Sequence, residues 1–256
     1  MRDLFAPLND CPAYRQIANM IEQRIVERSL RTGDALPSET DLARQFGVNR
    51  STVREAIREL EIQGLLGRGR GGKRLRVTRP EHDHVSGGVS RALALHDVTF
   101  QELWEAMMAI EPAAAQYAAA RRSASQMEAL MRACAHFERD AAHTVAAVAA
   151  EVEFFTAVAA ASGNQVLALS QASLNLLLAP ALTRMLDRIP QARTRIREAQ
   201  AKITSAIKLR KSEQARAWME KHIRDFKRGH ELENGPREAS RDARLESQAR
   251  RQSRLR

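Results

Sequence analysis

The residues with the clearest chemical potential lie around position 50. Arg50, Ser51, Thr52 and Arg54 follow Asn49 at the start of a segment with helical spacing of apolar residues. Guanidinium and hydroxyl groups on the first turn of a helix can donate hydrogen bonds to base edges and phosphates in the major groove. This pattern predicts a recognition helix that reads double-stranded DNA.

The flanking residues predict the elements that would position this helix. Ser38 has an acidic residue, Asp41, three positions later, which is typical of a helix N-terminus, and Asn49 is a second candidate cap. Gly47 favours a tight turn between two short helices, and Gly64 suits the end of the second helix. A basic, glycine-rich loop follows, so the sequence predicts a winged helix-turn-helix.

The order of these motifs resembles the GntR family of bacterial transcription regulators over about residues 12–80. The resemblance is carried by Pro-Ser-Glu, Leu-Ala, Val-Asn-Arg-Ser-Thr-Val-Arg-Glu-Ala-Ile and Gly-Leu-Leu. It implies that the helix and the wing contact an operator. One departure is Thr40, where the family often has arginine, so the operator preference is expected to be shifted. The implied DNA contacts are Arg50, Ser51, Thr52, Arg54, Thr40, Gly69, Arg70, Gly71, Gly72 and Lys73.

Composition agrees with a nucleic-acid binder, because the net charge is +10 and the isoelectric point is about 10.5. The two cysteines, Cys11 and Cys134, match no metal or redox spacing, which fits a reducing bacterial cytoplasm. We find no signal peptide and no apolar run approaching the roughly 18 residues of a membrane span, so no membrane partner is expected. Catalytic motifs such as His-Glu-x-x-His or a nucleophile elbow are absent, and the chain is not expected to be an enzyme.

The expected fold is mainly α-helical: an N-terminal winged helix-turn-helix with a small β wing, then an all-α antiparallel bundle. Capping-box spacings at Thr99–Glu102 and Ser125–Glu128 predict the first two helices of the bundle. Further helices are expected over about 143–161, 164–188, 191–210 and 212–230. The predicted domains are 1–80 for DNA binding, 81–98 as a linker, 99–230 as the bundle and 231–256 as a basic disordered tail.

The predicted bundle resembles the FCD domain of the FadR-like branch of this family over about residues 100–228. The motifs include Leu103-Trp104-Glu105-Ala106, Glu111-Pro112, Glu151-x-x-Phe154 and Ser162-Gly163-Asn164, followed by Met219-x-x-His222. The resemblance implies a domain that binds a small-molecule effector and forms dimers.

Departures from that branch concern the positions that often hold a divalent metal. They fall on Glu151, Phe155, Gln200 and His222, and a phenylalanine cannot act as a ligand. We therefore expect no metal or other cofactor. Met107 occupies the place of an arginine that would bind an acidic effector. These changes predict a fairly apolar effector, bound by Met107, Glu151, Phe155, Gln200 and His222, although a core without a ligand or a small carboxylate effector would also fit.

An operator of two inverted half-sites requires a two-fold protein, so a homodimer is expected. In the family, effector binding usually releases the protein from DNA, which implies a repressor. The alternative is an architectural DNA-binding protein that has no effector.

Overall fold

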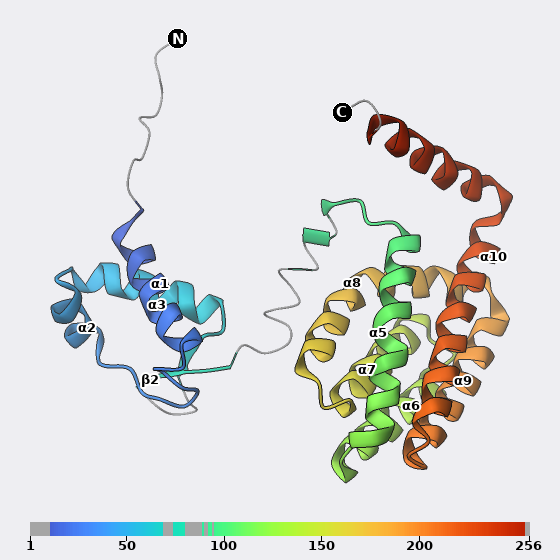
Figure 1. Cartoon of the computed structure of the whole chain (residues 1–256), viewed down its shortest axis with the longest axis horizontal. Coiled ribbons are helices and arrows are strands. Elements are labelled where there is room, and N and C mark those ends of the chain that lie inside the picture. The colour runs from blue at the N-terminus through green and yellow to red at the C-terminus, as the bar shows by residue number, and fades with distance from the viewer. Residues whose placement is uncertain (1–10, 69–73, 80–88, 90–91, 94, 254–256) are drawn as a thin grey trace. The chain divides into compact units, whose positions relative to one another are not determined.

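The computed structural model describes residues 11–68, 74–79, 89, 92–93 and 95–253 (Figure 1). The chain divides into two compact units, Met1–Val85 and Ser86–Arg256, and the division falls inside the segment predicted as a linker. The fold class agrees with the prediction, since both units are mainly helical and the described strands form one small antiparallel sheet.

The N-terminal unit has three helices, α1 (Ala13–Val26), α2 (Glu39–Phe46) and α3 (Arg50–Ile62). The strands β1 (Leu66–Arg68) and β2 (Leu75–Val77) pair antiparallel, with Leu66 opposite Val77. Apolar side chains from all five elements form one core, including Ile17, Ile21, Leu42, Val53, Ile57, Leu60, Leu66 and Val77. This core fixes α3 so that its polar face stays outside.

The turn between α2 and α3 is formed as predicted. Ser38 Oγ accepts a hydrogen bond from the Asp41 backbone N–H at 3.2 Å and donates one to Asp41 Oδ2 at 2.6 Å. Gly47 closes α2 with a φ of 65°, a left-handed conformation that favours glycine. Asn49 occupies the N-cap position of α3, but its side chain makes no capping hydrogen bond, so that part of the prediction was wrong.

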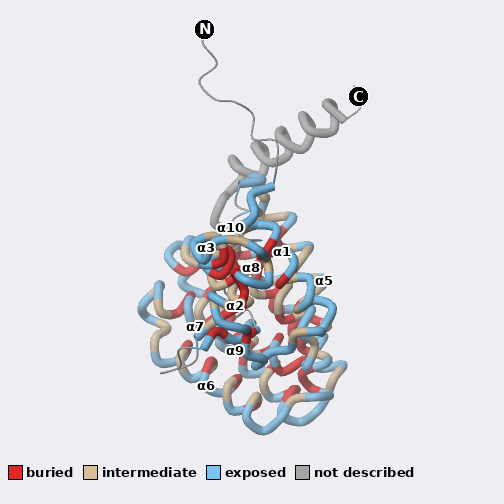
Figure 2. The backbone as a smooth tube through the Cα atoms, turned by 90° about the vertical axis from the view of Figure 1, so that its left-hand side faces the viewer, coloured by how far each residue is buried: buried red, intermediate tan, exposed pale blue. Residues whose placement is uncertain are grey.

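The C-terminal unit is a bundle whose helices are joined by short connections. Its helices are α5 (Phe100–Arg121), α6 (Ala124–Asp140), α7 (Thr144–Ala161), α8 (Gln165–Arg188), α9 (Pro190–Lys208) and α10 (Ser212–Ser253). Figure 2 shows buried residues along the inner faces of these helices. The interior is made mainly of alanine, leucine and phenylalanine side chains, among them Phe137, Phe154 and Phe155.

Two predicted boundaries in this unit need correction. The capping box of α6 is formed by Ser123 and Gln126 rather than by Ser125 and Glu128. In addition, α10 continues as a helix to Ser253, where the sequence predicted a disordered tail from residue 231. Residues 231–253 are rich in glutamate, arginine, alanine and glutamine, which all have high helix propensity, and this composition explains the extension.

Two helices are more apolar than the sequence analysis recognised. By length and composition, Thr144–Ala161 and Gln165–Arg188 could each cross a membrane, although 50% and 39% of their most apolar windows are buried inside the bundle. Alanine, serine and glutamine break up the apolar runs in the sequence and conceal this property. Core helices of bundles meet the same criterion, so this finding alone places no segment in a membrane.

Candidate DNA-binding surface and buried polar cluster

The first turn of α3 presents the predicted DNA contacts on the protein surface. Arg50, Ser51 and Arg54 are exposed, and Thr52 is half-buried. The opposite face of the helix packs into the core through Val53, Ala56, Ile57 and Leu60. A helix anchored on one side in this way can enter a major groove with its polar side chains already directed outward.

Glu39, the first residue of α2, connects the recognition helix to the wing. Its Oε2 accepts hydrogen bonds from Arg54 Nη2 at 3.1 Å and Arg54 Nε at 3.2 Å, and its Oε1 lies 3.5 Å from Arg68 Nη2 on β1. The two donors of Arg54 to one carboxylate fix the direction of its guanidinium group. The sequence analysis missed this role of Glu39, even though the residue lies within the Pro-Ser-Glu motif.

Thr40 and Arg50 line the same hollow on this surface. Other residues of the hollow come from the segment before α2 and from the strands, including Arg68 and Arg74. Two further predicted contacts, Arg50 and Thr40, therefore lie near the wing strands. The loop predicted to enter the minor groove, Gly69–Lys73, lies outside the described residues.

In the helical unit, a buried polar cluster joins three helices. Glu151 on α7 accepts a hydrogen bond from Gln200 Nε2 on α9, and its Oε1 lies 2.7 Å from His222 Nε2 on α10. All three side chains are at least 98% buried. Phe155 stacks on His222, with ring centroids 5.6 Å apart and an angle of 15° between the rings. Four of the five predicted effector residues therefore converge on one place.

The fifth residue, Met107, is buried on α5 in the same hydrophobic core. The pockets next to the cluster are lined by His222, but not by the other four residues. The predicted set thus forms mostly a packed interior, and His222 is the member that reaches open space.

The cluster does not suit a divalent metal. Among the residues that the structure describes, no three histidine, cysteine, aspartate or glutamate side chains are grouped so that they could hold an ion. Glu151 and His222 supply one carboxylate and one imidazole, whereas Gln200 offers an amide and Phe155 offers no donor. Zinc sites in proteins use at least three protein ligands that bind well.

Glu111 on α5 is a fully buried carboxyl group near the cluster. Neither of its oxygens has a hydrogen-bond partner within the described part of the chain. Burial raises its pKa well above the usual value, the negative charge of Glu151 raises it further, and the Gln171 side chain opposes the shift. A neutral Glu111 avoids placing a second unpaired charge in the bundle.

This environment predicts a pH-dependent stability that Glu111→Gln should reduce. A carboxyl group with a raised pKa in the folded state stabilises the fold below its unfolded pKa, and this contribution is lost as the pH rises through the folded pKa. Between about pH 5 and pH 8, urea unfolding should show a smaller loss of stability in the variant than in the parent chain. Glu128→Gln, at an exposed position on α6, is the control. Identical pH profiles for all three chains would contradict the prediction.

Comparisons with known proteins match both units. The model described as "Bacterial regulatory proteins, gntR family" matches residues 13–74, and the FCD domain model matches residues 102–225. The Mannosyl-D-glycerate transport/metabolism system repressor MngR of Escherichia coli (strain K12) is 51% identical over 55 residues, which cover 22% of this chain and 23% of that protein.

A longer sequence match joins this chain to the HTH-type transcriptional repressor NanR of Cronobacter sakazakii, with 28% identity over 163 residues and 62% of each chain covered. Both sequence matches span less than two thirds of the relative's length. A solved structure titled Streptococcus agalactiae GntR shares the fold, with a TM-score of 0.59 and 24% identity over 84% of this chain and 99% of that chain.

Proposed function

The chain belongs to the gntR family of bacterial regulatory proteins and carries an FCD domain, and from this premise we propose that it is a DNA-binding transcriptional repressor. It reads an operator in the bacterial cytoplasm, and a small molecule bound in the helical unit lowers its affinity for that operator. The proposal includes no catalytic step, no cofactor and no membrane partner.

The observation that carries the proposal is the exposed first turn of α3 together with the ion pairs of Glu39. Arg54 is held against α2, and Arg68 on β1 is drawn toward the same carboxylate. Recognition helix and wing are therefore pre-arranged as one reading surface. Pre-arrangement lowers the conformational entropy that DNA binding would otherwise cost.

We infer that the active form is a homodimer, because an inverted-repeat operator requires a two-fold partner. The bundle offers a suitable contact on α8. This helix is apolar along most of its length yet incompletely buried, and Val166 and Leu176 are 72% and 58% exposed. A second copy of the chain would cover these side chains.

Leu176→Glu tests this contact. Because each dimer would bury two copies of the side chain, the substitution should weaken dimerisation by at least about tenfold. Sedimentation or light scattering over a range of protein concentrations measures the effect. Leu209→Glu is the matched control, since Leu209 is 59% exposed at the end of α9. Equal association of both variants and the parent chain would place the interface elsewhere.

Effector control follows from how the buried cluster connects the bundle. Glu151, Gln200 and His222 join α7, α9 and α10, so a ligand that displaces His222 would change how these helices pack. A ligand shifts a protein between two states only by the difference of its affinities for them. The proposed effector therefore favours a packing of the bundle in which the dimer no longer fits both half-sites.

A reporter gene in a bacterial host tests the repressor assignment. An operator obtained by selection from random DNA is placed across the promoter, and the chain is expressed from a separate plasmid. Expression of the reporter should fall when the chain is present and should be unchanged when the operator is scrambled. A rise in expression would make the protein an activator, and equal effects on both promoters would indicate architectural binding.

A further inference from the structure

A cleft between α9 and α10 remains unexplained by the DNA-binding surface and the buried cluster. Two adjoining pockets make up the cleft, and both are lined by Arg195, His222 and Asp225. Their volumes are about 350 and 670 Å³ including the open mouths. Pockets of this size are typical of small-molecule sites.

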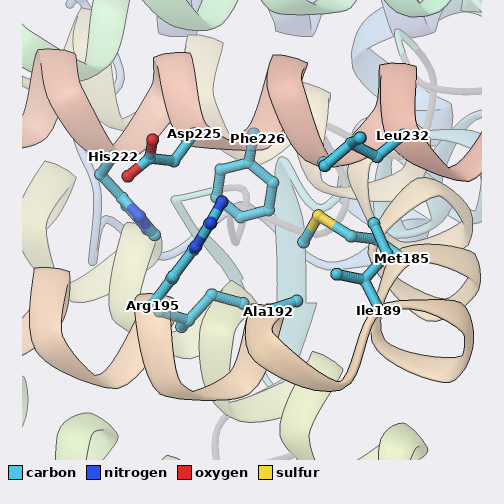
Figure 3. Close-up of a pocket in the computed structure, with 10 residues that line it drawn as sticks. Met185, Ile189, Ala192, Arg195, His222, Asp225, Phe226 and Leu232 are labelled. Atoms are coloured by element: carbon cyan, nitrogen blue, oxygen red, sulfur yellow. The ribbon is translucent and has the colours of Figure 1, made fainter.

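The inner pocket is apolar. Its walls include Met185 and Ile189 at the end of α8 and Ile196, Phe226 and Leu232 on the two facing helices. Figure 3 shows Arg195 reaching in from one side, and His222, Asp225 and Phe226 from the other. This compartment suits a ring or a short alkyl chain.

Gly229 lies in the wall of the inner pocket. A Cβ atom there would lie 2.4 Å from Met185 Sδ, so even an alanine would force the methionine side chain to move. The glycine therefore keeps space in this part of the cleft.

The outer pocket gathers positive charge around an aromatic ring. Lys202 and Lys221 hold their ammonium groups 5.8 and 4.9 Å from the centroid of Trp218, and Arg195 stands beside them. Within the described ranges, none of these three cations forms an ion pair with a carboxylate. Two acidic residues, Glu198 and Asp225, also line the cleft, and Asp225 lies 3.9 Å from Arg228. The cations are thus in excess, and they are available to an anion.

His222 lies at the junction of the two pockets. Its Nε2 is committed to Glu151, so Nδ1 is the ring nitrogen left for a ligand. A ligand in the cleft would meet the imidazole on the side away from Glu151. Its binding would therefore act directly on the cluster that joins α7, α9 and α10.

From this geometry we propose that the α9–α10 cleft is the effector site and that it takes an organic acid with an apolar body. The carboxylate lies among Arg195, Lys202 and Lys221, and the ring or alkyl chain enters the inner pocket. This inference rests on the proposed function and names the chemical class of its effector. Small hydroxy acids would leave the apolar compartment unused, and neutral apolar molecules would leave the cations unpaired.

Calorimetry with the full-length chain tests the proposal with defined probes. Phenylacetate and hexanoate are compared with phenylacetamide and hexanol, which keep the apolar body without the charge, and with lactate, which keeps the charge without the body. At least one of the two apolar acids should bind about tenfold more tightly than its neutral counterpart and than lactate, as expected for charge-assisted hydrogen bonds. Arg195→Met should weaken that binding about tenfold, and Gly229→Ala should weaken it by narrowing the inner pocket.

Lys208→Met is the matched control, since Lys208 is exposed on α9 and does not line the cleft. Circular dichroism and operator binding without ligand check that each variant is folded. Equal binding of the neutral probes or of lactate, no loss with Arg195→Met, or no binding of either apolar acid up to about 10 mM would overturn the inference. If the parent chain binds a selected operator, these failures leave the proposed function standing; if it binds no specific DNA, the proposed function itself fails.

Discussion

Arg54→Ala is expected to weaken operator binding about 5- to 150-fold, which corresponds to 1–3 kcal/mol for a lost bidentate base contact. The arginine is exposed on the first turn of α3, and Glu39 holds its guanidinium group in one direction. Arg50→Ala should have a similar effect because Arg50 also lies in this turn. Fluorescence anisotropy with the selected operator and with a random duplex measures both losses.

Arg58→Ala is the control for these variants. Arg58 is exposed on α3 but lies two turns beyond Arg50, away from the predicted contact region. This substitution should change operator binding little. If Arg50→Ala and Arg54→Ala weaken operator and random DNA to the same extent, the arginines contact phosphates only, and the assignment to base reading is wrong.

Glu151→Ala is expected to destabilise the helical unit by about 3–5 kcal/mol, the usual cost of removing one partner from a buried ion pair. The carboxylate is the acceptor for Gln200 and the partner of His222, and the interior offers them no water in exchange. Urea unfolding followed by circular dichroism measures the change.

Glu153→Ala supplies a comparison on the same helix. Glu153 lies 2.8 Å from His136, but that pair is exposed, so the expected loss is at most about 1 kcal/mol. Similar losses for Glu151→Ala and Glu153→Ala would show that the buried cluster contributes little to the stability of the bundle.

Local sequence signals predicted most of the DNA-binding unit. Ser38 and Gly47 act through their own side chain or backbone conformation, so their roles could be read from a few neighbouring residues. The ion pairs of Glu39 could not, because Arg54 and Arg68 lie 15 and 29 residues away in the chain. Only the packing of α2 against α3 and β1 brings these charges together.

The helical unit shows the same limit more strongly. The convergence of Glu151, Gln200 and His222 was indicated by family resemblance, since no spacing within the chain connects three helices. Arg195 and Trp218 carried no motif at all, and their place in the cleft depends on how α9 meets α10. The wing contacts at Gly69–Lys73 stay predictions, because that loop lies outside the described residues.

The most direct test of the account is selection of binding sites by the full-length chain from a random DNA library, followed by footprinting of the enriched sequence. The account predicts one enriched motif with two inverted half-sites, protected symmetrically by a dimer and no longer enriched by Arg54→Ala. Broad protection of DNA without any enriched motif would contradict it and would make the chain an architectural DNA-binding protein.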